Sequence, residues 1–484
     1  MYHTLAHHMD YGLLVLYQVP TVRHRFEDPQ HDHDVDWADL FFDLTYVAAA
    51  YRLGTMLKAD VSPRGVFHFL VLSCCMMDAW KFKTLHDSMF EATDVFHKMI
   101  DVFYVCTVGA AAIFIRPLIE LEDVSQGHAF GLSLALFLNC SVLGAEKMEI
   151  FIRSPSRAAH VQTMLNMIIE VLPRWLFYAA AAVVAGNYRD ANNHRKGDGD
   201  GGDGDESNQI TEDRTKYGVV NWLLLSAYLG GSFLPLLLWL GKVLPDNVIP
   251  WHYKHIAHRY GEWIMLVLGE SILSVILAPV ENRMRYYLCF FTALLIVQML
   301  QLVHFSSEEF DANKHALYRK LRSGRLWLFL MTAYSISLIA LGVSLKAVLS
   351  YVVCDVDAYS SDYDDIESDR RMLRPGGTHI SHRNLLATEY SSFYADSSGD
   401  GDGDSGNDVL YGSDGYCTFV PGRYVWLLCS AFTAQYVVLQ VSISMFNNSS
   451  DAVFTSYVIA GSWSFFQLYI FVAHNILAGQ YTAA

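Results

Sequence analysis

Two apolar segments of the sequence carry acidic residues at their centres, where a carboxylate could bind a cation or a proton. They are residues 37–47, with Asp39 and Asp43, and residues 259–271, with Glu262 and Glu270. A charged side chain at the centre of a membrane helix costs about 2.5–3.5 kcal/mol on insertion scales. Such residues are expected to face a partner, a water-filled cavity or a transported solute, so these segments are where function is sought first.

Asp39 and Asp43 are four residues apart and therefore share one face of a helix. In the functional interpretation they form a carboxylate site for a cation or a proton. In the structural alternative, Asp39 caps the start of the helix and Asp43 hydrogen-bonds a neighbouring helix. The spacing is compatible with both interpretations.

The second segment predicts a polar stripe along one helix. Arg259 and Glu270 are eleven residues apart, which returns to nearly the same side of a helix, and Glu262 lies within one turn of Arg259. We expect an ion pair between Arg259 and Glu262, with Glu270 deeper and with Ser271 and Ser274 as its hydrogen-bonding companions. The alternative is an interhelical network that only sets helix register, as polar groups in membrane helices often do.

A third candidate pair, Glu170 and Arg174, has i, i+4 spacing with the acid first, which is the favourable direction for a pair within one helix. Pro173 lies beside it and leaves a backbone carbonyl without its usual donor. The spacing predicts a structural intrahelical ion pair. In the functional interpretation the pair lines a transport pathway.

The elements that carry these residues are predicted to be membrane helices. Of the 484 residues, 52% are hydrophobic and 17% are charged, against about 25% charged in soluble domains. Eleven apolar runs have close to the twenty residues that span a bilayer, and none alternates as a barrel strand would. The runs are roughly 38–58, 64–82, 98–117, 127–146, 161–186, 217–241, 258–279, 284–305, 325–350, 421–446 and 452–474. The sequence therefore predicts an all-α, polytopic helical membrane protein with about eleven transmembrane helices.

Two acidic, Gly- and Ser-rich stretches divide this membrane body. Residues 187–216 hold eight acids against five Lys and Arg, and residues 354–419 hold fourteen against four Arg. Both are predicted to be disordered loops, because such sequences bury too little apolar area to fold. The predicted organisation is a polar tail (1–36), a first helix bundle (37–186), the first loop (187–216), a second helix group (217–353), the second loop (354–419) and two last spans (420–484).

Charge in the short loops predicts the orientation. Loops on the N-terminal side carry fourteen basic residues and short loops on the other side carry five. The positive-inside rule then places the N-terminus in the cytoplasm and both acidic loops outside or in a lumen. On that side, a disulfide between Cys354 and Cys417 would join the two ends of the second loop.

The sequence offers no support for an enzyme, a cofactor, a metal site or nucleic-acid binding. It contains no phosphate loop, dinucleotide fingerprint, zinc-ligand spacing or nucleophile elbow. His252, His255 and His258 spread too widely around a helix to hold one ion, and are interpreted as a polar helix start. The expected partners are the lipid bilayer and a small solute or cation.

The charged segments resemble motifs of the bacterial low-temperature-requirement A family. Residues 37–47 resemble its opening motif, W-x-E-L-F-F-D-L-V-F-V, and residues 255–271 resemble its H-x-x-E-R-F-G…V-L-G-E-S helix. Trp80-Lys-Phe-Lys-Thr84, followed by Asp94 and His97, resembles the stretch between its second and third helices. The order agrees from about residue 37 to 320. His258 stands where the family has an acid, and both acidic loops look like insertions.

The resemblance implies a bundle of many membrane helices and supplies no chemistry. Acids near the starts of the first and seventh spans suggest two parallel repeats, which is a known transporter plan. Three hypotheses remain open: a proton- or ion-linked transporter using Asp43, Glu270 and Glu170–Arg174; a cation channel; and a structural protein that helps cells tolerate cold. The first is preferred, because ionisable residues inside a membrane commonly mark solute or proton pathways.

Overall fold

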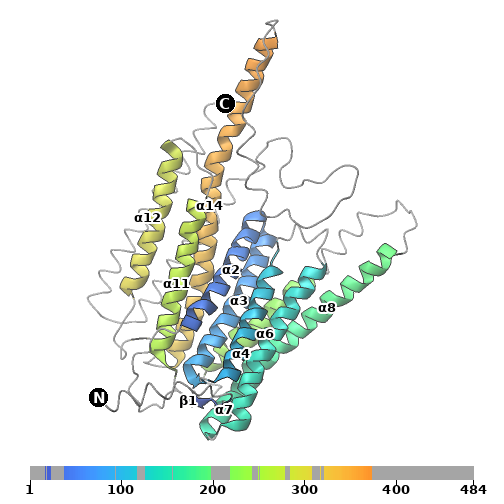
Figure 1. Ribbon diagram of the computed structural model, residues 1–484, viewed down its shortest axis with the longest axis vertical. Helices are drawn as coiled ribbons and strands as arrows, with labels where there is room; N and C mark the ends of the chain where they lie inside the picture. The colour runs from blue at the N-terminus through green and yellow to red at the C-terminus, as the bar shows by residue number, and fades with distance from the viewer. Residues whose placement is uncertain are drawn as a thin grey trace.

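The computed structural model shows a bundle of long helices (Figure 1). The structure describes residues 17, 19–22, 37–92, 94–116, 126–154, 156–197, 218–241, 249, 251–277, 284–307, 315, 317 and 321–372. The helices are α2 (Trp37–Ala59), α3 (Pro63–Met89), α4 (Val95–Ile113), α6 (Gln126–Arg153), α7 (Arg157–Asn166), α8 (Leu172–Gly197), α10 (Leu234–Leu240), α11 (Tyr253–Ile276), α12 (Met284–Ser307) and α14 (Leu321–Met372).

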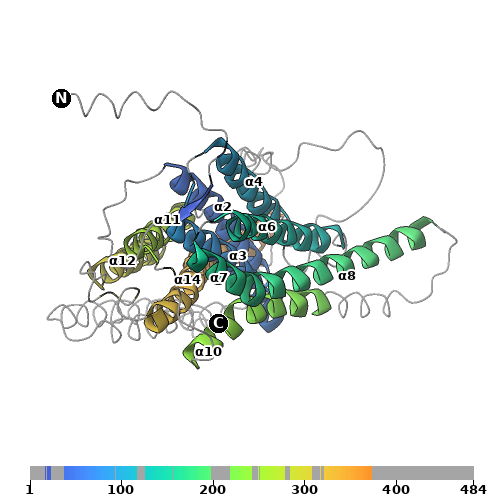
Figure 2. The ribbon, with the colours of Figure 1, turned by 90° about the horizontal axis from the view of Figure 1, so that it is seen from below.

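The bundle has two halves joined by α2 and α3. Helices α4, α6 and α8 pack together on one side, and α11, α12 and α14 pack on the other. Helix α2 contacts α4 on one side and α11 and α14 on the other, and α3 likewise contacts α6, α11 and α14. Figure 2, seen from below, shows this central position of α3. Side chains on α2 and α3 can therefore link both halves.

Local sequence explains where several helices begin. Pro63 occupies the first turn of α3, where its missing N–H costs nothing, and the Ser62 hydroxyl accepts a hydrogen bond from the Gly65 N–H. His252 caps α11 by accepting from the His255 N–H at 3.0 Å. The three-histidine run is thus a polar helix start, as interpreted from the sequence.

A two-stranded antiparallel contact holds part of the N-terminal tail against the bundle. Strand β1 (Thr21–Val22) pairs with β2 (Phe90–Glu91), directly after α3. Nearby, the Tyr17 hydroxyl donates to Glu149 Oε1 at 2.5 Å, and the Arg153 guanidinium lies over the Tyr17 ring. The segment predicted as a polar tail (1–36) therefore includes residues that dock on the ends of α3 and α6.

Six helices among the described residues are long and apolar enough to cross a membrane. They are Pro63–Met89, Val95–Ile113, Gly127–Arg153, Arg157–Asn187, Gly218–Leu240 and Ser323–Leu349, with a shorter apolar helix at Tyr286–Leu302. The all-α membrane fold is confirmed. The total of about eleven spans and the parallel repeat stay predictions, and the two last spans, with Cys417, lie outside the described residues.

Helices continue into both segments predicted as acidic loops. Helix α8 extends to Gly197, past the predicted boundary at 187, and α14 extends to Met372, past the boundary at 354. The first part of each segment is therefore helical. The physical reason is cooperativity: once a long helix is nucleated, each added residue makes one more backbone hydrogen bond at little cost.

Two π-helical turns interrupt neighbouring helices and contact each other. Turn η2 (Met167–Val171) joins α7 to α8, and turn η3 (Leu229–Phe233) precedes α10. Each lies two residues before a proline, Pro173 and Pro235, which cannot donate the normal i→i−4 hydrogen bond. Turns of this type occur often at functional sites.

Close packing of α11 on α14 depends on a glycine. A Cβ atom at Gly342 would lie 2.4 Å from Ser271 Oγ and 3.1 Å from Ser271 Cβ. We expect Gly342→Ala to lower the free energy of unfolding by about 1–3 kcal/mol, because overpacking forces the helices apart. Denaturant unfolding in detergent measures this. Gly269→Ala on α11, with nothing within 4 Å, is the control and should not destabilise. Equal effects of both would contradict the packing argument.

Candidate functional site

The two charged motifs of the sequence meet in the interior of the bundle. Asp43 on α2 is fully buried, and its Oδ1 accepts from Arg259 Nη2 on α11 at 2.8 Å and from Trp80 Nε1 on α3 at 2.7 Å. Arg259 is 3% exposed. One carboxylate thus ties three helices together, and the ion pair is shielded from solvent.

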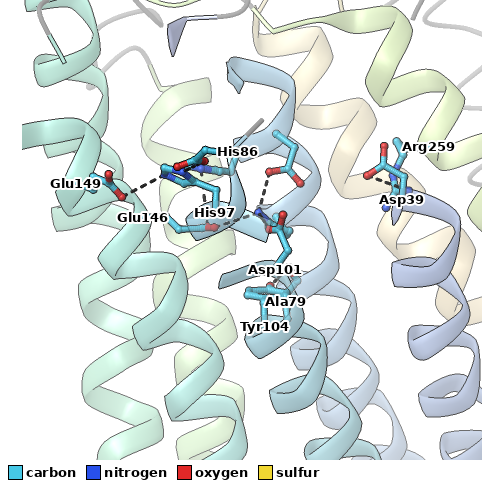
Figure 3. A network of polar contacts seen from close by, with 12 residues as sticks. Asp39, Ala79, His86, His97, Asp101, Tyr104, Glu146, Glu149 and Arg259 are labelled. Carbon is cyan, nitrogen blue, oxygen red and sulfur yellow. Dashed lines mark hydrogen bonds and ion pairs between the residues drawn. The ribbon is translucent and has the colours of Figure 1, made fainter. Parts of the chain in front are cut away.

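Arg259 also lies close to the two other acids predicted near it, Asp39 and Glu262. Its Nη1 lies 3.6 Å from Asp39 Oδ1 and 3.9 Å from Glu262 Oε2. The guanidinium lies over the Phe42 ring, with 5.5 Å between Cζ and the ring centroid. Asp39 and Asp43 therefore do share a helix face, and that face is directed at α11. Figure 3 shows Asp39 beside Arg259. The expected contact between Arg259 and Glu262 forms, but it is the longest of the three.

Beside this ion pair, and including Trp80, lies a set of packed aromatic rings. The Trp80 ring packs against Trp263 at 5.5 Å and edge-on against Tyr260 at 4.8 Å, and Tyr260 packs against Trp327 of α14 at 5.1 Å. Tyr46 of α2 completes it with an edge contact to Trp263. All five side chains are buried. We call these residues the aromatic layer.

A second buried charge cluster centres on Asp78 of α3. Its Oδ1 lies 2.6 Å from Lys81 Nζ, its Oδ2 lies 2.8 Å from Arg174 Nε of α8, and it accepts from the Ser232 hydroxyl of η3. Arg174 also donates to the Gly231 carbonyl. The Asp78 and Lys81 side chains are at most 8% exposed, so this pair is enclosed inside the bundle.

The predicted intrahelical pair of Glu170 and Arg174 does not form. Arg174 bonds to Asp78, and Glu170 Oε1 lies 3.5 Å from Arg325 Nη1 of α14. The reason is η2, which contains Glu170: the wider π turn changes the angle between residues before and after it. Side chains at i and i+4 therefore no longer lie above each other, and the two charges face different partners.

The two π turns border a polar cavity of about 50 Å³. Its charged lining comes from four helices: Lys81 of α3, Lys147 of α6, Glu170 of η2 and Arg325 of α14. The polar side chains of Gln162, Asn166 and Ser232 also line it. We call this space the π-turn cavity.

A second cavity, of about 150 Å³, lies between α2, α11 and α14. It is lined by Glu270 and Ser271 together with Lys58 and Lys346. The Ser274 hydroxyl donates to Glu270 Oε1 at 3.2 Å, whereas the Ser271 hydroxyl donates to the Val267 carbonyl. Of the two serines expected beside Glu270, Ser274 forms a hydrogen bond with it and Ser271 bonds to the backbone instead. We call this space the Glu270 cavity.

A third set of charges fastens α3, α4 and α6 near the loop after α3. Lys83 Nζ lies 3.0 Å from Asp87, 2.7 Å from Asp101 and 3.2 Å from Glu146. Beside it, His86 approaches Glu146, and His97 pairs with Asp94 and Glu149. Figure 3 shows that these side chains form a group apart from Asp39 and Arg259. Nothing in the acid spacing alone predicted this group.

The sequence was compared with known protein families, curated proteins and solved structures. A profile of the bacterial low temperature requirement A protein (LtrA) family matches residues 34–365. The chain belongs to the LtrA family. No curated protein and no solved structure matches it significantly. The match covers α2 through most of α14, and therefore all three charge groups and both cavities.

Each of the three segments that resemble LtrA motifs supplies side chains to the site. Residues 37–47 supply Asp43, residues 80–84 supply Trp80 and Lys81, and residues 255–271 supply Arg259 and Glu270. The Trp80-Lys-Phe-Lys-Thr84 segment is the signal that could have identified Lys81 and Lys83 as buried site residues. Lys147, Ser232 and Arg325 had no comparable signal.

Proposed function

We propose that this LtrA-family protein is a proton-linked transporter of a small solute. The observation that supports the proposal is a pair of charged cavities placed along one bundle of membrane helices and separated by the buried aromatic layer. A carrier needs a site that communicates with one side at a time, and a closed layer between two polar spaces fits that requirement.

The separation can be followed along α14. Arg325, Leu328 and Phe329 line the π-turn cavity, and residues from Ile339 to Lys346 line the Glu270 cavity. At about 1.5 Å per residue, Phe329 and Ile339 lie roughly 15 Å apart along the axis. Tyr334 is buried within this interval, and Trp327 of the aromatic layer is buried just before it, at the level of the π-turn cavity. The barrier is thus thick and filled by large rings, which favours a carrier over an open cation channel.

Glu170 is the carboxylate that best suits proton coupling. It lines the π-turn cavity, and among the described residues its one ion-pair contact is with Arg325, at 3.5 Å. Protonation would remove its charge and release Arg325 from that contact. Asp43 is less suited, because it is enclosed by Trp80 and Arg259 and lines neither cavity.

Proton movement in proteoliposomes tests this proposal. With a pH-sensitive dye inside the vesicles, an inward gradient of inorganic phosphate should change the internal pH in vesicles that contain the wild-type protein and not in protein-free vesicles. Glu170→Gln should lower the initial rate at least about tenfold, since a neutral amide cannot carry the proton. Solute counterflow should survive in that variant.

The matched control is Asp101→Asn, which removes a half-exposed carboxylate outside both cavities. It should keep most of the coupled rate. The proposal fails if no tested solute gradient moves protons or if the two variants lose the same fraction of the rate. Single-channel currents in planar bilayers would instead point to the channel hypothesis.

A further inference from the structure

The charged lining of the π-turn cavity is unbalanced. Three cations, Lys81, Lys147 and Arg325, face it together with one carboxylate, Glu170. Asp78 lies behind Lys81, but it also pairs with Arg174 and so does not neutralise the excess. A buried excess of positive charge is costly unless a counter-charge is bound or a cation gives up its proton.

Lys147 is the cation that requires an explanation. It is 2% exposed and lines the cavity. No hydrogen bond or salt bridge joins its ammonium group to any of the residues that the structure describes. The contrast with Lys83 is direct, since Lys83 is also buried, at 6% exposed, and lies within 3.2 Å of three carboxylates.

The remaining cations of the cavity are held in fixed positions. The Arg325 guanidinium lies over the Trp239 ring at 3.9 Å and near the Trp251 ring at 5.4 Å. Lys81 Nζ is fixed by Asp78 at 2.6 Å and by the Ser232 hydroxyl at 3.2 Å. A ligand entering the cavity would therefore meet positioned donors, which lowers the entropic cost of binding.

The cavity volume sets the size of such a ligand. One water molecule needs about 10–15 Å³ of this kind of space, so a cavity of about 50 Å³ holds roughly three to five waters. That is room for one carboxylate- or phosphate-sized group rather than for a large metabolite. Gln162 and Asn166, joined by a 3.0 Å hydrogen bond, add amide groups on the same wall.

We propose that the π-turn cavity binds a small oxyanion, a carboxylate or phosphate group, with the Lys147 ammonium as its main contact and Arg325 and Lys81 beside it. This inference rests on the proposed transport function only in naming its substrate class. Binding itself is measurable without transport. The group could belong to a free anion or to a lipid headgroup, and the experiment separates these two sources.

The test is thermal unfolding of the purified full-length protein, followed by intrinsic tryptophan fluorescence. In detergent, sodium phosphate is compared with sodium chloride at equal ionic strength, and acetate is a second probe. Wild-type Tm should rise by roughly 3 °C or more at saturating phosphate, since a ligand that binds only the folded state stabilises it. Lys147→Met should lose this rise.

Lys346→Met, which removes a lysine from the other cavity, is the matched control and should keep the rise. Lys147→Gln is the second variant and keeps a polar side chain should methionine perturb folding. For the lipid source, nanodiscs of phosphatidylcholine are compared with nanodiscs containing phosphatidylglycerol. Stabilisation by the anionic lipid alone, lost in both Lys147 variants, would assign the site to a headgroup.

The inference is overturned if neither phosphate, acetate nor anionic lipid stabilises the wild-type protein, or if both Lys147 variants respond as the wild type does. A phosphate-dependent rise without any flux would keep the anion site and remove the transporter. Proton-coupled flux without any Lys147-dependent stabilisation would support the transporter and rule out the anion site.

Discussion

Replacing Asp78 with asparagine should destabilise the protein by about 3–5 kcal/mol or more, because removing one partner strands a buried charge. Here two cations lose their counter-charge at once, Lys81 at 2.6 Å and Arg174 at 2.8 Å. Asparagine keeps the size and can still accept from the Ser232 hydroxyl. We therefore expect poor recovery of folded protein and a large fall in Tm, measured by size-exclusion profile and thermal unfolding in detergent.

The double variant Asp78→Asn with Arg174→Met tests whether charge is the cause. Removing one stranded cation should restore part of the lost stability, whereas two independent defects would add. Arg174 also lies over the Phe82 ring at 3.5 Å, a contact that methionine can partly replace. A double variant that is less stable than Asp78→Asn alone would argue against the charge explanation.

Asp43→Asn should have the second large effect, again about 3–5 kcal/mol, by leaving Arg259 without its closest carboxylate. The amide oxygen of asparagine can still accept from Trp80 Nε1, so the change isolates the charge. Asp39→Asn is the control, because Asp39 is partly exposed and 3.6 Å from Arg259, and it should cost well under about 1 kcal/mol. Denaturant unfolding compares the two.

This comparison also separates two interpretations of the Asp43 carboxylate. If Asp43 mainly joins helices, Asp43→Asn with Arg259→Met should regain stability and keep proton-coupled flux, since an apolar replacement for a whole buried pair is often neutral. If Asp43 instead carries protons, the double variant should be stable but inactive. Equal stability of Asp43→Asn and Asp39→Asn would contradict the central role of the ion pair.

The sequence predicted the membrane helices and singled out the two acidic motifs that meet inside the bundle, because both signals depend on local composition. Apolar runs of bilayer length indicate helices whatever their partners, and buried acids such as Asp43 are unusual enough to stand out. Which partner each acid finds is a question of tertiary packing. The contact between Asp43 and Arg259 joins residues 216 positions apart, and spacing rules on one helix cannot predict it.

The π turns explain the clearest failure of the sequence interpretation. The i, i+4 rule assumes a regular α-helix, and η2 breaks that regularity at Glu170. Pro173 was recognised as a residue that leaves a carbonyl without its donor, but a proline can produce a kink, a break or a bulge. Only the packing of η2 against η3 in this structure decides among them.

Lys147 was missed for a different reason. It is a single basic residue near the end of an apolar run, where lysine usually extends toward the lipid headgroups. The packing of α6 against α7 and α8 encloses it instead. Whether a lysine near a helix end is buried depends on the neighbouring helices. The pattern of residues around Lys147 in the sequence therefore could not predict its burial.

Because Glu146 and Lys147 are adjacent on α6, the contacts that they make on two sides of the helix are mechanically coupled. Successive residues on a helix point about 100° apart, so Glu146 reaches Lys83 on one flank while Lys147 reaches the π-turn cavity on another. A rotation of α6 about its own axis that moves Lys147 further into the π-turn cavity would therefore also move Glu146 away from Lys83.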